Sequence, residues 1–169
     1  MKTRKLTTLS LLTAIALTIF MVEAQIPSLV PLPGVKLGLA NIITLLLLKN
    51  FSLREAFPVL IARIFIATFL FGQFLSLFYS LSGGICCLFA MYFINRLLKG
   101  HFLPVTAIFG ALFHNLGQLL VALMLTASPA PLAYLPFFIL SAAVTGSFTG
   151  FCAYFSQKYL GQILKAQGF

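Results

Sequence analysis

Acidic residues are almost absent from this sequence. Its 169 residues include two glutamates, Glu23 and Glu55, and no aspartate, while hydrophobic residues make up 61% and charged residues 8%. A water-soluble domain needs a surface of interspersed charge, and this chain has too little charge to cover one. The composition therefore excludes a soluble domain and indicates that the chain is surrounded by lipid.

Cysteine is also scarce, and its placement gives no sign of a disulfide or a metal site. Cys86, Cys87 and Cys152 lie inside apolar runs, with no metal-ligand spacing and no loop to tie down. We interpret them as small packing residues. Without aspartate or a paired cysteine set, the histidine at 114 cannot complete a zinc site, so we expect neither a metal nor another cofactor.

Apolar runs fill most of the chain and predict an all-α integral membrane protein. A bilayer-crossing helix needs roughly 20 apolar residues, and the second run is shorter, which predicts a half-length or tilted helix. The first run follows the basic start MKTRK but precedes no convincing cleavage site, so we expect it to be retained. The prediction is a single membrane domain over residues 1–169, a bundle of six helices spanning 6–22, 37–48, 53–71, 75–98, 102–126 and 134–159.

The net charge of +9 is better explained by membrane topology than by nucleic acid, because the cations are scattered between apolar runs. Positively charged loops stay in the cytoplasm. Lys36 falls on the outer side and Arg63 within a span. We therefore expect a multi-pass protein of the cell membrane with both termini in the cytoplasm, where nine of the eleven cations lie: Lys2, Arg4, Lys5, Lys49, Arg54, Arg96, Lys99, Lys158 and Lys165.

Arg63 is the most informative of the polar residues inside the apolar runs. It lies in the stretch IARIFIATF, where a guanidinium costs at least about 2.5 kcal/mol on insertion scales. Glu55 is too far along the same helix to pair with it. We expect Glu23 or the anionic part of a ligand to compensate the charge. The alternative is an arginine that reaches the membrane surface.

His114, Asn115 and Gln118 form a second polar group, in FHNLGQLL. His114 and Gln118 are four residues apart and share a helix face, and Asn115 is three residues from Gln118. The trio can converge on one cavity and, with Arg63, would line a binding pocket. The alternative is a set of hydrogen bonds that joins neighbouring helices.

The stretch PGVKLGLANI, residues 33–42, places Lys36 and Asn41 at the mouth of the short second run. The proline and glycine residues predict an irregular loop. A lysine beside a helix N-terminus favours an anion, through charge and through the helix dipole. The alternative is a lysine that anchors the helix at the membrane surface.

KLGLANI at 36–42 and HNLGQL at 114–119, together with the order of the apolar runs, resemble the membrane family described as heptaprenyl diphosphate synthase component I. That family is also called the Gx transporter family and is grouped with the substrate-binding S components of energy-coupling factor transporters. The resemblance implies a six-helix subunit that captures a vitamin-like molecule at its outer face. It also implies partners: a transmembrane coupling protein and two ATPases. The absence of a GxxxxGK[ST] motif fits that division.

The resemblance further implies a small-residue docking surface on the first helix. Such components carry an AxxxA-like pattern there, and the nearest match is Ser10 to Ala14, with serine in place of the first alanine.

The synthase description points to a second possibility. Prenyl chain elongation of the usual kind holds magnesium on diphosphate through aspartate-rich motifs, and this chain has no aspartate. We therefore expect no enzymatic activity from the chain itself. The main hypothesis is substrate capture for an importer, with a flavin-like molecule, a quinone precursor or a prenyl phosphate as the ligand. The alternative is a non-catalytic membrane partner of an isoprenoid or quinone biosynthesis enzyme, and a third possibility is a stand-alone facilitator.

Overall fold

Each apolar run of the sequence forms a helix in the computed structural model, which describes residues 2–25, 36–71 and 74–166. No strand occurs in these ranges, so the all-α prediction is confirmed. The elements in chain order are α1 (Lys2–Ala24), α2 (Asn41–Asn50), α3 (Leu53–Phe71), α4 (Phe74–Leu97), α5 (Leu103–Thr126), the 3-10 helix η1 (Ala130–Tyr134) and α6 (Leu135–Ala166).

Four stretches are long and apolar enough to cross a membrane: Thr3–Ala24, Phe74–Leu97, Leu103–Thr126 and Ala130–Leu164. Helix α2 has only 10 residues, and α3 carries three charged residues among its 19. Large apolar side chains on the outside of the bundle are exposed, as expected of a surface in contact with lipid. The chain is therefore a multi-pass membrane protein by length and composition, and the six-span count stays a prediction.

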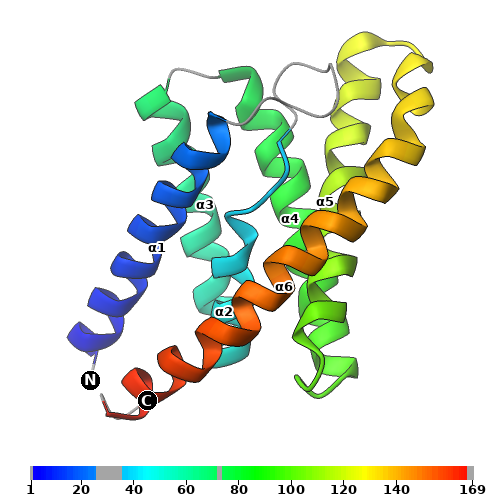
Figure 1. Cartoon of the computed structure of the whole chain (residues 1–169). Coiled ribbons are helices and arrows are strands. Elements are labelled where there is room, and N and C mark those ends of the chain that lie inside the picture. Colours follow the sequence, from blue (N-terminus) through cyan, green and yellow to red (C-terminus); the bar gives the residue numbers. More distant parts are fainter. Residues whose placement is uncertain (1, 26–35, 72–73, 167–169) are drawn as a thin grey trace.

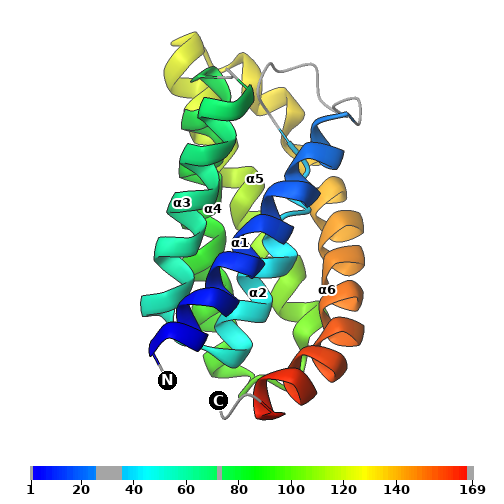
Figure 2. The same ribbon diagram turned by 90° about the vertical axis from the view of Figure 1, so that its left-hand side faces the viewer.

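The helices form a bundle with the first turn of α1 and the last turn of α6 at the same end (Figures 1 and 2). We call this the termini end and the opposite one the far end. Helix α2 lies in the interior, where it packs against all five other α-helices, whereas α1, among the described elements, contacts α2 and α3. The shared end fits the prediction that both termini lie on one side of the membrane.

The short helix α2 is entered through a non-helical segment. Residues 36–40 lead into the bundle from the far end (Figure 1), and α2 begins at Asn41 rather than at residue 37, where the sequence predicted it. Gly38 explains the later start because its φ of +82° lies outside the right-handed helical region. Backbone amides inside a membrane protein need partners, and Gly38 N donates to Glu23 Oε1 at 2.5 Å. The second apolar run thus consists of a short non-helical entry over residues 36–40 followed by the 10-residue helix α2.

Glycines allow α6 to lie very close to α5. A Cβ atom added to Gly146 would lie 2.5 Å from Ile108 Cα, and one added to Gly150 would lie 2.4 Å from Pro104 Cα. Neither backbone atom could move away without shifting its helix. Gly146 and Gly150 therefore serve packing within the chain.

Candidate functional site

Polar side chains gather inside the bundle and retain atoms without hydrogen-bond partners. They come from α1, α2, α3, α4 and α5, and all are buried. Within the described residues no partner is found for Glu23 Oε2, Asn41 Oδ1, Arg63 Nε, Ser76 Oγ, His114 Nε2 or either amide atom of Gln118. We call these six residues the polar cluster. Five of the six were candidate site residues of the sequence, and Ser76 was not.

Arg63 and Glu23 provide the charges of the polar cluster. Arg63 is 5% exposed and Glu23 is 4% exposed, so neither side chain reaches the surface. Their charges are close enough to attract each other, but the one salt bridge between described residues, Lys5 with Glu55 at 2.6 Å, is elsewhere. The expected compensation of Arg63 by Glu23 is thus present as a longer-range attraction, and it leaves Arg63 Nε unpaired.

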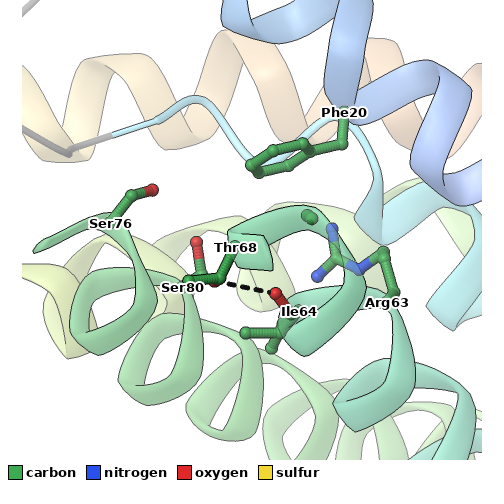
Figure 3. A pocket seen from close by; sticks show the side chains of 7 residues that line it. Phe20, Arg63, Ile64, Thr68, Ser76 and Ser80 are labelled. Carbon is green, nitrogen blue, oxygen red and sulfur yellow. Dashed lines mark hydrogen bonds between the residues drawn. The ribbon is translucent and has the colours of Figure 1, made fainter. Parts of the chain in front are cut away.

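A small cavity adjoins Arg63. Figure 3 shows the guanidinium group extending toward the space beneath the Phe20 ring, with Thr68, Ser76 and Ser80 nearby. The hydroxyl of Thr68 donates to the carbonyl of Ile64 in its own helix, whereas Ser76 Oγ has no partner. The cavity volume is about 10 Å³, which is close to the space that one water molecule requires. A larger ligand can enter only if the surrounding helices separate.

His114 is held between two glycines. Its Nδ1 lies 3.3 Å from Asn41 Nδ2. A Cβ atom added to Gly38 would lie 3.1 Å from Nε2 of the ring, and one added to Gly83 would lie 3.0 Å from Nδ1. The backbone of α4 and the segment that leads into α2 therefore approach the imidazole from two sides. The sequence indicates His114 as a site residue but not the two glycines beside its ring, because neither glycine is near His114 in the chain.

Gln118 and Asn115, the other two polar residues of the HNLGQL stretch, have different environments. Gln118 is 0% exposed, and neither its Oε1 nor its Nε2 has a partner. Asn115 donates from Nδ2 to Phe138 O of α6 at 2.8 Å, which joins α5 to α6. The interpretation of the trio as a pocket thus fits Gln118 and His114, and the alternative, a link between helices, fits Asn115.

Lys36 lies next to the polar cluster, at the far end of the bundle. It is half-buried, and its Nζ lies 3.8 Å from the centre of the Phe20 ring. Burial lowers the pKa of Lys36 from its ordinary value, Glu23 opposes this shift, and Arg63 adds to it. Because Phe20 also borders the Arg63 cavity, one aromatic ring connects the two cations.

The predicted docking residues lie away from the polar cluster. Ser10 and Ala14 are exposed on the outer face of α1, on the opposite side from Leu12 and Ala16, which are buried. A docking role for Ser10 and Ala14 requires this exposure and stays a prediction. Of the residues that the structure describes, no three histidine, cysteine or acidic side chains are grouped closely enough to hold a metal ion.

Comparison with known proteins identifies a family. Neither the curated proteins nor the solved structures include a match to this chain. The model of the family described as heptaprenyl diphosphate synthase component I matches residues 12–156, a range that contains every member of the polar cluster. Since the match covers most of the 169 residues, the chain belongs to the heptaprenyl diphosphate synthase component I family.

Proposed function

We propose that this chain is a non-catalytic membrane subunit that holds a small molecule with a polar or anionic head in the polar cluster and acts beside a separate enzyme of isoprenoid synthesis. The observation that carries the proposal is the set of buried polar atoms without partners. A buried polar atom that lacks a hydrogen bond costs about 1–3 kcal/mol. A cluster of such atoms is therefore costly to keep unless a ligand pairs with them.

The charges of the polar cluster indicate what kind of ligand would fit. Arg63 contributes one positive charge and Glu23 one negative charge. Lys36, next to the polar cluster and over the Phe20 ring, contributes a second positive charge. Asn41 and Gln118 add amide groups that can donate or accept hydrogen bonds. The surplus of positive charge favours a ligand that carries an anionic group and further polar atoms.

The family description supports a partner enzyme. It names a component of heptaprenyl diphosphate synthase, which implies at least one further component. Magnesium bound to a diphosphate is held by carboxylates. The two acidic side chains of this sequence bind different parts of the structure, Glu23 the Gly38 amide and Glu55 both Lys5 and Ser52, so they form no shared carboxylate site. We therefore assign chain elongation to the partner and ligand holding to this subunit.

A second candidate is the substrate-binding component of an energy-coupling factor importer. Two observations favour it. The non-helical segment 36–40 and the carboxylate that holds it lie toward the far end, away from both termini (Figure 1). Ser10 and Ala14 leave a lipid-facing patch of small side chains on α1, which suits close approach by another helix. In this case the partners would be a coupling protein and ATPase subunits.

Copurification distinguishes the two candidates. The chain would be tagged, extracted from its own membranes with a mild detergent, and its bound proteins identified by mass spectrometry. A soluble prenyl-transferring enzyme among them would support the first candidate. ATPase subunits with a membrane coupling protein would support the second, and their loss in Ala14→Leu, but not in Ile15→Phe on a neighbouring face of α1, would locate the contact. If neither set copurifies, the partner roles in both candidates are wrong.

Ligand holding has its own test. Native mass spectrometry of the same preparation should detect a small molecule bound to the protein. Arg63→Gln should lower its occupancy at least about tenfold, because a hydrogen bond to a charged group contributes about 1.5–3 kcal/mol. Thr145→Val, which changes a buried hydroxyl bonded within its own helix, should keep the ligand. Equal occupancy in all three proteins would refute a ligand site at Arg63.

A further inference from the structure

A second pocket lies at the termini end, distant from the polar cluster. It has a volume of about 660 Å³ and lies between the end of α2, the start of α3 and the end of α4. Pockets of this size are large enough for a small organic ligand. Its described lining residues are Leu48, Phe51, Ser52, Leu53, Arg54, Tyr92, Asn95 and Arg96.

The lining separates into an apolar part and a cationic part. Leu48, Phe51 and Leu53 supply hydrocarbon surface, whereas Arg54 and Arg96 supply two guanidinium groups. Of the described residues that line the pocket, none is acidic. An amphiphile with an anionic head and an apolar chain matches both parts.

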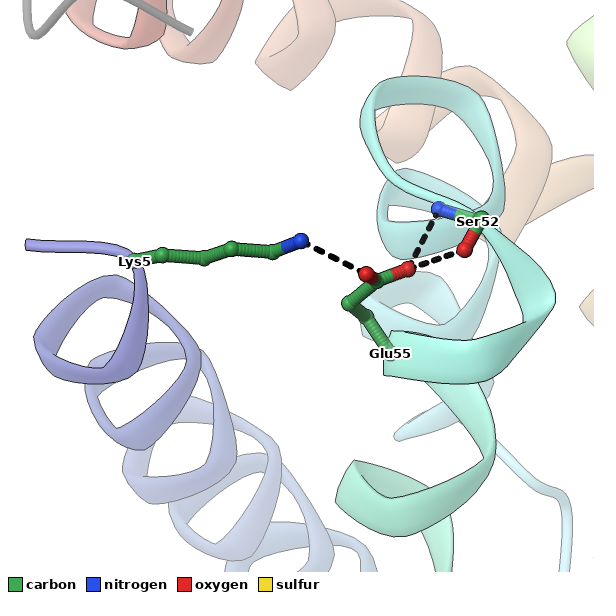
Figure 4. A network of polar contacts seen from close by, with 3 residues as sticks. All are labelled: Lys5, Ser52 and Glu55. Atoms are coloured by element: carbon green, nitrogen blue, oxygen red, sulfur yellow. Dashed lines mark hydrogen bonds and ion pairs between the residues drawn. The ribbon is translucent and has the colours of Figure 1, made fainter. Parts of the chain in front are cut away.

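The positive charge of this pocket is not neutralised by the protein. The sequence contains two acidic residues. Glu23 is buried in the polar cluster. Glu55 accepts hydrogen bonds from Lys5 and from Ser52 N (Figure 4), so its carboxylate is already engaged. Among the residues that the structure describes, Arg54 and Arg96 therefore have no carboxylate partner, and an external anion could fill that place.

One of the two arginines is already oriented. Arg96 Nη1 donates to Tyr92 Oη at 3.0 Å, and both residues line the pocket. This bond leaves the other guanidinium N–H groups available, and guanidinium groups bind phosphate through paired N–H donors. Asn95 also lines the pocket, and its Oδ1 is buried without a partner. Because an asparagine amide carries two donors beside that oxygen, it can turn to donate as well as accept.

From this arrangement we propose that the pocket bounded by Arg54 and Arg96 binds the phosphate or diphosphate head of an amphiphilic molecule whose hydrocarbon chain lies along Leu48, Phe51 and Leu53. Phosphate groups fit better than carboxylates because a phosphate offers three acceptor oxygens and a larger negative charge, which two arginines from different helices can bind together. Basic pockets between helices at a membrane surface bind phosphorylated head groups in this way. Such a head could come from a prenyl diphosphate or from an anionic phospholipid. The proposal does not depend on the polar cluster or on the partner enzyme.

The experiment measures binding to the purified full-length chain in a zwitterionic detergent. The probes are farnesyl diphosphate, farnesol as the same chain without the head, and inorganic pyrophosphate as the head without the chain. Farnesyl diphosphate should bind more tightly than either fragment, since farnesol lacks the anionic head and pyrophosphate lacks the apolar chain. The paired variant Arg54→Gln with Arg96→Gln should weaken its binding at least about tenfold. Arg54→Lys with Arg96→Lys, which keeps the charge, should retain part of the affinity.

Arg4→Gln is the matched control, because Arg4 is exposed at the same end and lines no described pocket. It should bind farnesyl diphosphate like the unaltered chain. Equal weakening by Arg4→Gln would show general charge attraction and overturn the proposal, as would equal binding of farnesol and farnesyl diphosphate. Competition by dioleoyl phosphatidylglycerol, tested against phosphatidylcholine, then distinguishes the sources. Displacement by phosphatidylglycerol alone assigns the pocket to phospholipid, and no displacement assigns it to the prenyl diphosphate.

Discussion

Replacing Gln118 with methionine should make the ligand-free protein more stable. Gln118 is 0% exposed, and its donor and acceptor both lack partners. Each such group costs about 1–3 kcal/mol. Methionine has nearly the same length and shape, so the change should cost less than about 1.5 kcal/mol in packing. The net gain in unfolding free energy should be about 1–3 kcal/mol, since a gain is expected from both atoms but the two are not strictly additive.

Thermal unfolding in mild detergent, after the ligand has been removed, measures this gain. For a chain of this size, each kcal/mol corresponds to about 2–4 °C in Tm. Thr145→Val serves as the control, because its hydroxyl is already bonded to Ser141 O at 2.8 Å and its removal should bring no gain. The same Gln118→Met protein should hold less ligand in native mass spectra.

A clear loss of stability in Gln118→Met would refute the reasoning. It would mean that the Gln118 amide has partners in the ligand-free protein and contributes to its folding. Higher stability with undiminished ligand occupancy would show that Gln118 does not bind the ligand. Arg63 and His114 would then be the remaining candidates for ligand binding.

Two further predictions concern packing and topology. Gly150→Ala should lower Tm, since its Cβ would lie 2.4 Å from Pro104 Cα. Gly161→Ala on the same helix should leave Tm unchanged or raise it, because its Cβ would meet only Gln157 Nε2 at 3.6 Å. A lower Tm for Gly161→Ala than for Gly150→Ala would show that α5 and α6 do not approach as described. In a cysteine-free background, Ala130→Cys should react with an impermeant reagent outside intact cells and His101→Cys should not, and labelling of His101→Cys alone would invert the orientation.

The sequence predicted those parts of the fold that depend on local composition. Apolar runs located the six α-helices of the described residues. The spacing of four between His114 and Gln118 predicted a shared helix face, and both side chains are buried. The cost of a charge in lipid indicated that Arg63 needs compensation, and Glu23 does lie close enough to attract it. These inferences succeed because the lipid environment penalises polar groups strongly wherever they occur.

Long-range contacts were beyond what the sequence could predict. The bond from Gly38 N to Glu23 Oε1 joins two elements whose relative placement no periodicity encodes. The positions of Gly38 and Gly83 beside the His114 ring depend on how three segments come together. Asn115 carries the same amide group as Gln118, yet the course of α6 past α5 determines its partner, Phe138 O. Each is a property of the packed bundle rather than of one helix.

Both ends of helix α1 are held by polar contacts of the two acidic side chains of the sequence, Glu23 and Glu55. Near the termini end Lys5 of α1 binds Glu55, and near the far end Glu23 of α1 binds the amide of Gly38. Between these points α1 presents apolar side chains, and in a bilayer lipid can replace such contacts at little cost. A change of charge at either carboxylate should therefore displace α1 more readily than a change in its apolar face. The position of α1 relative to the bundle would then depend on two polar contacts, Lys5 with Glu55 and Glu23 with the Gly38 amide. Loss of the Glu23 contact would release segment 36–40 beside the polar cluster.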